Sequence, residues 1–128
     1  MNAPPTDCEF FDAAKEAFSF MPALVSTEKR STFYSASFAS RMLRLSVSYD
    51  LRDNAVDCSI EELRDASTHD LIPLPTHCSL HGFVVAKRGY RGAFREFLPS
   101  NKSDPPWKIE LDKFGLAVRH FFVIEATA

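Results

Sequence analysis

The chain has 128 residues, of which 45% are hydrophobic and 25% are charged, and its formal net charge at pH 7 is −2. This length favours a single domain over residues 1–128, because a second hydrophobic core would have too little material. The small negative charge argues against a general nucleic-acid-binding protein, which usually carries a large positive excess, and no run of apolar residues is long enough to span a membrane.

The N-terminal region is predicted to contain a short tail followed by a helix. Residues 1–5 end in two prolines and are expected to be flexible. Residues 1–8 lack the basic and apolar regions of a secretory signal. Thr6 and Glu9 then match a capping box, which predicts a helix over residues 7–20 that ends before Pro22. The missing signal and the odd number of widely spaced cysteines indicate the cytoplasm as the compartment.

The clearest pattern in the chain is a strict alternation of apolar and polar residues over positions 42–50. The apolar row consists of Leu43, Leu45, Val47 and Tyr49. A period of two places one row on a buried face of a strand and the other row in water. Strands are also predicted over residues 32–39 and 56–60, with a tight turn at residues 51–54 and a polar connection over residues 26–30.

The C-terminal half is predicted to be mainly helical. Ser79 and Gly89 suit the start and the end of a short helix over residues 80–88, although its apolar centre would also suit a strand. Residues 108–125 carry a stripe of apolar residues at helical spacing, which predicts a long helix. Its β-branched end leaves a terminal strand as the alternative.

Three further segments complete the predicted fold. Residues 61–67 could form one helical turn, residues 69–75 form a loop or an edge strand, and residues 94–98 form a short helix. Together these elements predict an α+β fold. An antiparallel sheet of three or four strands would be packed on one face by the N-terminal and the C-terminal helix.

Acidic and basic residues are distributed unevenly along the chain. Residues 50–70 contain seven acids and two arginines, whereas residues 87–102 contain five basic residues and one glutamate. Such asymmetry steers association with an oppositely charged partner, and the alternative is that both runs are solvated loops. The candidate partner-binding residues are Asp50, Asp53, Asp57, Glu61 and Glu62. The basic segment could instead contact a nucleic acid, although its Phe94 and Phe97 suit the core better.

His77, Cys78 and His81 form the best candidate for a metal or ligand site. On a helix, the two histidines would lie one turn apart, as zinc ligands often do. Two prolines just upstream and the lack of a glutamate in zinc-protease register favour a local structural role, so neither a metal nor a cofactor is predicted. The alternative function is a small enzyme or ligand-binding domain that uses these residues, with His69 or His120.

Two of the cysteines suit packing better than nucleophilic catalysis. Cys58 belongs to the apolar row of a predicted strand, which indicates a small buried side chain. Cys8 lies in the first turn of the predicted N-terminal helix, where the helix dipole could lower its pKa. The sequence also contains no phosphate-binding loop and no dinucleotide-binding motif.

The strand over residues 42–50, the turn Leu51-Arg52-Asp53-Asn54 and the strand after it resemble a pattern of small bacterial proteins. Several of these are uncharacterised, and others are immunity proteins that neutralise polymorphic or contact-dependent toxins. The resemblance covers residues 33–60 and implies a non-enzymatic protein-binding module that occludes a cognate toxin domain. In this interpretation the acidic residues meet a basic cleft, as on a nuclease. Because the binding surface differs among such proteins, no contact residue is carried over.

Overall fold

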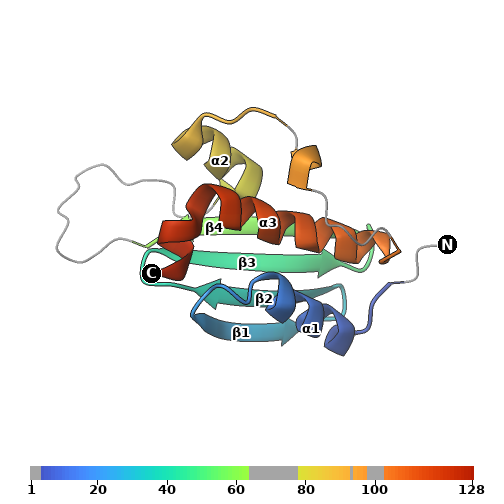
Figure 1. Cartoon of the computed structure of the whole chain (residues 1–128). Helices are drawn as coiled ribbons and strands as arrows, with labels where there is room; N and C mark the ends of the chain where they lie inside the picture. Colours follow the sequence, from blue (N-terminus) through green and yellow to red (C-terminus); the bar gives the residue numbers. More distant parts are fainter. Residues whose placement is uncertain (1–3, 64–77, 93, 98–102) are drawn as a thin grey trace.

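The computed structural model describes residues 4–63, 78–92, 94–97 and 103–128, and it confirms the predicted α+β fold (Figure 1). Four long strands and a two-residue fifth strand form one antiparallel sheet in the order β1-β2-β3-β4-β5. The strands are β1 (Ala23–Lys29), β2 (Phe33–Ala39), β3 (Leu43–Asp50), β4 (Ala55–Glu62) and β5 (Cys78–Ser79). The helices are α1 (Asp7–Ala17), α2 (Leu80–Arg88) and α3 (Pro106–Thr127), with a short 3₁₀ helix, η1 (Phe94–Phe97).

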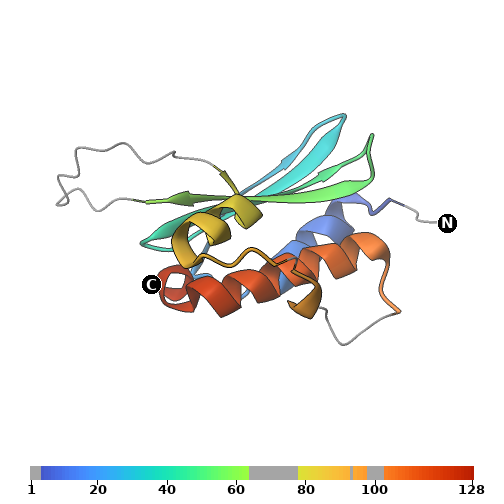
Figure 2. The same cartoon turned by 90° about the horizontal axis from the view of Figure 1, so that it is seen from above.

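The described helices pack on one face of the sheet, as predicted (Figure 2). The apolar row of β3 points toward them, and its four side chains are at most 2% exposed. Phe10 of α1 and Leu111 and Val118 of α3 belong to the same core, and the ring of Phe10 lies 6.1 Å from that of Tyr49. One-sided burial therefore explains why the sequence alternates so strictly over this strand.

Two tight turns connect the central strands. The backbone N–H of Ser40 donates to the carbonyl oxygen of Leu43 at 2.8 Å and closes the β2–β3 turn. The predicted turn over residues 51–54 is confirmed, and Asn54 adopts a left-handed φ of 54° there. The carboxylate of Asp50 accepts hydrogen bonds from the backbone N–H groups of Arg52 and Asp53, at 2.8 and 3.1 Å. These bonds favour the turn locally.

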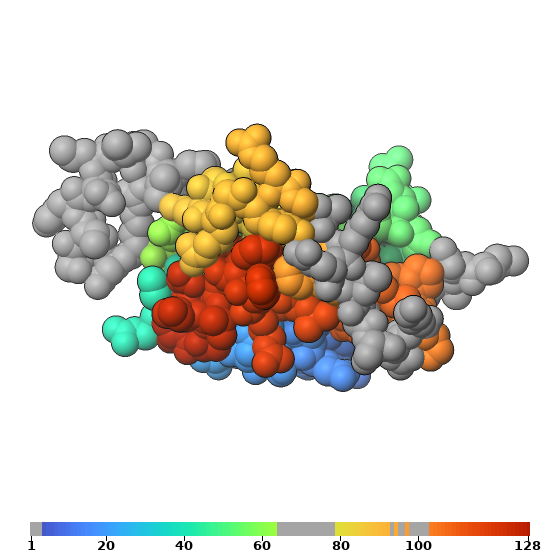
Figure 3. Space-filling view, turned by 45° about the horizontal axis from the view of Figure 1, so that its top comes forward, coloured from blue at the N-terminus to red at the C-terminus, as the bar shows by residue number. Residues whose placement is uncertain are grey.

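On the helical face, α3 lies between α1 and α2 (Figure 3). Its contact with α1 depends on Gly115, because a β-carbon at that position would lie 2.6 Å from the carbonyl oxygen of Ala17. No real side chain tolerates such a distance to backbone atoms, so glycine permits the two helices to approach closely. This contact holds α1 beside α3 on the helical face. No described helix covers the opposite face of the sheet.

Arg88 at the end of α2 fastens that helix to α3. The backbone of Phe122 departs from helical geometry, with φ −133° and ψ 32°. At this kink the Nε–H of Arg88 donates to the carbonyl oxygen of Phe121 at 2.9 Å, and its guanidinium pairs with Glu125 at 2.6 Å. The same group lies over the Phe122 ring, 4.8 Å from the centroid. The arginine thus satisfies a backbone acceptor near the kink.

Several predicted boundaries require correction. Residues 26–30 are not a polar connection, because they fall in β1 and its following turn. Every residue of β1 is exposed, so no buried row marks the strand in the sequence. The first helix ends at Ala17 instead of residue 20, and residues 61 and 62 extend β4 instead of forming a helical turn.

The predicted helix over residues 80–88 is confirmed, with Ser79 as its N-cap and Gly89 at its end in a left-handed conformation, φ 69°. The helix expected over residues 94–98 is a 3₁₀ helix over its described part. α3 stays helical through residues 123 and 124, so the alternative of a terminal strand is wrong. The predictions for residues 64–67, 69–75 and 98 lie outside the described residues.

Candidate binding surface

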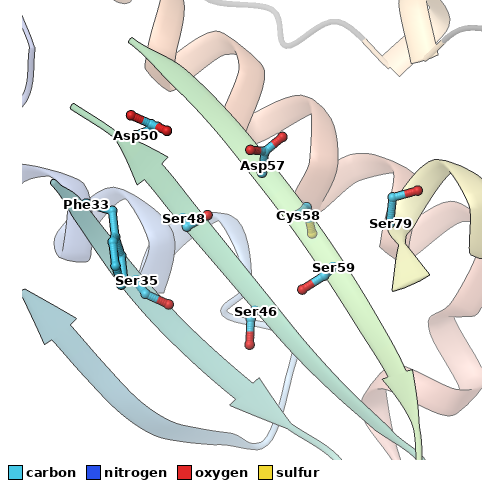
Figure 4. Close-up of a pocket in the computed structure, with 9 residues that line it drawn as sticks. All are labelled: Phe33, Ser35, Ser46, Ser48, Asp50, Asp57, Cys58, Ser59 and Ser79. Carbon is cyan, nitrogen blue, oxygen red and sulfur yellow. The ribbon is translucent and has the colours of Figure 1, made fainter. Parts of the chain in front are cut away.

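The face of the sheet opposite the helices, called the outer face below, carries mainly small polar side chains (Figure 4). The antiparallel register aligns one serine from each of the five strands across it. This serine row consists of Ser26, Ser37, Ser46, Ser59 and Ser79. The hydroxyl oxygens of Ser37 and Ser46 are 2.9 Å apart and form a hydrogen bond. The row therefore presents hydroxyl groups on a backbone held by the sheet ladder.

Next to the serine row runs a second row that contains carboxylates. Register places Glu28 of β1 opposite Ser35, Ser35 opposite Ser48, and Ser48 opposite Asp57. Asp50 lies further along β3, opposite Phe33 and Ala55. The outer face thus carries acidic groups at both ends of this second row.

Because these side chains are small and no described helix covers them, the outer face contains an open hollow of about 570 Å³. Its lining residues are Phe33, Ser35, Ser46, Ser48, Asp50, Asp57, Cys58, Ser59 and Ser79 (Figure 4). The lining offers hydroxyl groups, two carboxylates and one aromatic ring, with no basic side chain among these residues. Such a surface can accept hydrogen bonds and attract cationic groups.

The five predicted acidic residues do not share one position. Asp50 and Asp57 line the hollow, and Asp53 is exposed in the adjoining β3–β4 turn. Glu61 follows Asp57 and Ser59 on the outer face, opposite Arg44. Glu62 falls in the inward row with Leu43 and pairs with Lys87 of α2 at 2.8 Å. The structure therefore brings Asp50, Asp53 and Asp57 together and directs Glu62 to the helical side.

The outer-face serines are the residues that sequence reasoning missed. They occupy the polar positions of the same alternating pattern that predicted the strands, so the pattern did contain a signal for them. Glu28 was missed because β1 itself was not predicted. The alignment of five serines in one row depends on the register between strands, which spacing along the chain does not give.

The histidine and cysteine candidates are not brought together as a site by the described residues. α2 begins at Leu80 and contains His81, whereas His77 and His69 lie outside the described residues. His81 is exposed, with Nε2 3.3 Å from the carbonyl oxygen of Gly92. Within the described part of the chain, no three metal-ligating side chains gather.

His120 lies on the exposed side of α3, where its ring packs on the aromatic rings of Phe97 and Phe121. The basic segment over residues 87–102 is partly paired, since Lys87 contacts Glu62 and Arg88 contacts Glu125. Phe94 is buried in the core, as expected for a packing role. These contacts place Lys87, Arg88 and His120 against side chains of the helical side.

Cys58 is buried in the inward row of β4, and burial raises the pKa of its thiol, with the nearby charge of Asp57 as a smaller cause. Because the thiolate is the reactive form, this side chain should be inert in the folded protein.

We expect iodoacetamide at pH 8 to modify exposed Cys8 at least about 100-fold faster than Cys58, as measured by peptide mass spectrometry. In denaturant the two rates should converge; equal rates in the folded protein would contradict the buried position.

Comparisons with protein-family models, with curated proteins and with solved structures found no match. No helix in the described ranges combines the length and the apolar character needed to cross a membrane.

Proposed function

We propose that the chain is a non-enzymatic protein-binding module, an immunity protein that occludes a basic toxin domain with the outer face of its sheet. The observation that carries this proposal is the hollow lined by serines, Asp50 and Asp57. The resemblance of residues 33–60 to immunity proteins suggests the class of partner.

The small side chains of the outer face favour binding of protruding groups. Serine loses little side-chain freedom when it is covered, and the sheet backbone is already ordered, so binding pays a low entropic cost. A lysine or arginine of the partner can reach the carboxylates at the rim and still contact hydroxyl groups inside the hollow. Phe33, half-buried at the rim, offers an aromatic contact beside them.

The charge of this surface fits a nuclease-like partner. The cleft of an enzyme that acts on nucleic acid is basic, because it must hold phosphate groups. Asp50, Asp53 and Asp57 present negative charge at the end of the outer face where β3 meets β4. Such complementarity raises the association rate and selects against other partners. Inhibition then follows from steric occlusion, with no reaction performed by the chain.

Co-expression tests the proposal. The gene of this chain and that of a toxin domain encoded beside it are expressed together, and growth is compared with expression of the toxin domain alone. We expect the chain to restore growth and to copurify with the toxin domain as a stable complex. Failure of growth protection, together with the absence of a complex, would contradict the proposed function.

A further inference from the structure

β1 forms a free edge of the sheet, since no other described strand pairs beyond it (Figure 1). All seven of its residues are exposed, whereas the opposite edge strand, β5, has only two residues. The backbone groups along such an edge can form hydrogen bonds with a strand of another chain. The edge therefore has room for one more strand, and the charges along β1 indicate which strand fits.

The backbone groups that point outward follow from the β1–β2 turn. The N–H of Arg30 donates to the carbonyl oxygen of Phe33 at 2.8 Å, so these two residues form a hydrogen-bonded pair. Hydrogen-bonded and non-hydrogen-bonded pairs alternate along an antiparallel ladder. Thr27 and Lys29 therefore occupy non-hydrogen-bonded pairs with β2, and their N–H and C=O groups point away from the sheet.

The end of β1 carries charges of both signs, in the order Glu28, Lys29, Arg30. Glu28 and Arg30 lie on the outer face, where the Nε of Arg30 contacts Oε1 of Glu28 within one copy. Lys29 lies on the helical side, where its ammonium group pairs with Asp7 of α1 at 3.5 Å. The charges of these four side chains cancel, so a strand that carries only one sign of charge would meet a repulsive pair on either face.

A second copy of the chain supplies charges in a suitable order when the two edges run antiparallel about a twofold axis. The outward backbone groups allow three registers, namely Thr27 with Thr27, Thr27 with Lys29, or Lys29 with Lys29. The first sets Glu28 opposite Ser26, and the second sets Glu28 opposite Glu28. The third sets Glu28 of each copy opposite Arg30 of the other. Only this third register places opposite charges face to face.

We propose that two copies of the chain associate through their β1 edges, with Lys29 opposite Lys29 at the twofold axis. The two Lys29 residues exchange backbone hydrogen bonds, so Glu28 and Arg30 meet in non-hydrogen-bonded pairs, where facing side chains approach most closely. The contact within one copy uses Nε and Oε1, so the terminal nitrogens of Arg30 can reach Oε2 of Glu28 in the other copy. Symmetry gives two such pairs.

The cost of this register is the approach of two lysines on the helical side. Each ammonium group has a carboxylate beside it, since Asp7 lies 3.5 Å from Lys29, and the lysine side chain is 62% exposed, so it can bend away from its counterpart. The facing residues, 27–31 of each copy, also stay clear of the register shift between Leu24 and Ser26, where regular pairing would fail. The balance therefore favours association.

Association through this edge goes beyond the proposed function and leaves its surface free. A twofold axis perpendicular to the sheet keeps the helices of both copies on one side and both outer faces on the other. The two hollows then open in the same direction, so one dimer presents two outer faces side by side on a continuous sheet.

Sedimentation equilibrium between about 10 µM and about 1 mM protein tests the register by a charge swap. We expect wild type to dimerise with a dissociation constant on the order of 100 µM, because few residues of each edge face each other. Glu28→Arg brings two arginines face to face, and Arg30→Glu brings two glutamates face to face, so each should weaken the dimer at least about tenfold. Combining the two substitutions restores the opposite charges and should return the dissociation constant to within about threefold of wild type.

Asp12→Arg is the matched control, because it changes the net charge as Glu28→Arg does, at an exposed position of α1. It should dimerise like wild type. Lys29→Pro removes the outward N–H group at the axis, so the dilute variant should keep its melting temperature and remain monomeric at high concentration. If Lys29→Pro does not fold, the charge swap decides the question alone.

A wild-type chain that remains monomeric at about 1 mM would overturn the inference. A combined Glu28→Arg and Arg30→Glu variant that dimerises no better than the single variants would also overturn it, because the proposed register would be wrong. Dimerisation of folded Lys29→Pro at wild-type strength would place the contact elsewhere. None of these outcomes bears on the proposed function, which is tested separately by co-expression.

Discussion

Reversing the charges of Asp53 and Asp57 with the double substitution Asp53→Lys and Asp57→Lys should slow association with the proposed partner, a basic toxin domain, by roughly 10- to 100-fold at low salt. Both side chains are exposed at the end of the outer face. Neither side chain belongs to the hydrophobic core, so the free energy of unfolding should change little. Stopped-flow association at 20 mM and 150 mM salt measures the effect, which should shrink at the higher salt as screening increases.

The matched control is Asp12→Lys with Glu16→Lys, which changes the net charge equally. Both residues are exposed on α1, on the helical side of the sheet. Because steering depends on where charge lies and not only on its total, this control should bind at close to the wild-type rate. An equal slowing by the two double variants would show that only net charge matters and would remove Asp53 and Asp57 from the interface.

Leu45→Ala should lower the free energy of unfolding by about 2–5 kcal/mol, whereas Ser48→Ala on the same strand should change it by less than about 0.5 kcal/mol. Leu45 is fully buried beneath the helices, and Ser48 lies on the outer face with no helix of the described residues above it. For a domain with a total stability of about 5–15 kcal/mol, the loss at Leu45 is a large fraction.

Urea unfolding followed by circular dichroism measures both variants. Both positions lie on β3, and they differ in the face of the sheet to which the side chain points and in its burial. A large loss in Ser48→Ala would mean that something packs on the outer face in the isolated chain, and the hollow would then not be free for a partner.

The sequence predicted the central strands because one of their faces is buried and the other is open, which leaves a period of two in Leu43, Leu45, Val47 and Tyr49. β1 escaped prediction for the opposite physical reason, since exposure on both faces removes any periodicity. The helix over residues 80–88 was recognised through its caps, Ser79 and Gly89, although its interior is ambiguous.

The candidate surface was predicted in part. Counting charges along the chain found Asp50, Asp53 and Asp57, but a count does not tell which face a strand residue occupies. Glu62 shows the difference: it lies two residues after buried Ile60, so the pleat sends it toward the helices, where it meets Lys87. The row of serines requires the register of five strands, and register arises from turn geometry and core packing together.

The central claim is that the partner binds the outer face of the sheet, and Ser48→Arg tests it most directly. Ser48 lines the middle of the hollow, so an arginine there fills the space and opposes a basic partner without entering the core. Isothermal titration of the toxin domain should show at least about a 100-fold loss of affinity relative to the Asp12→Lys and Glu16→Lys control, with an unchanged melting temperature. Wild-type affinity in a folded Ser48→Arg variant would contradict the account.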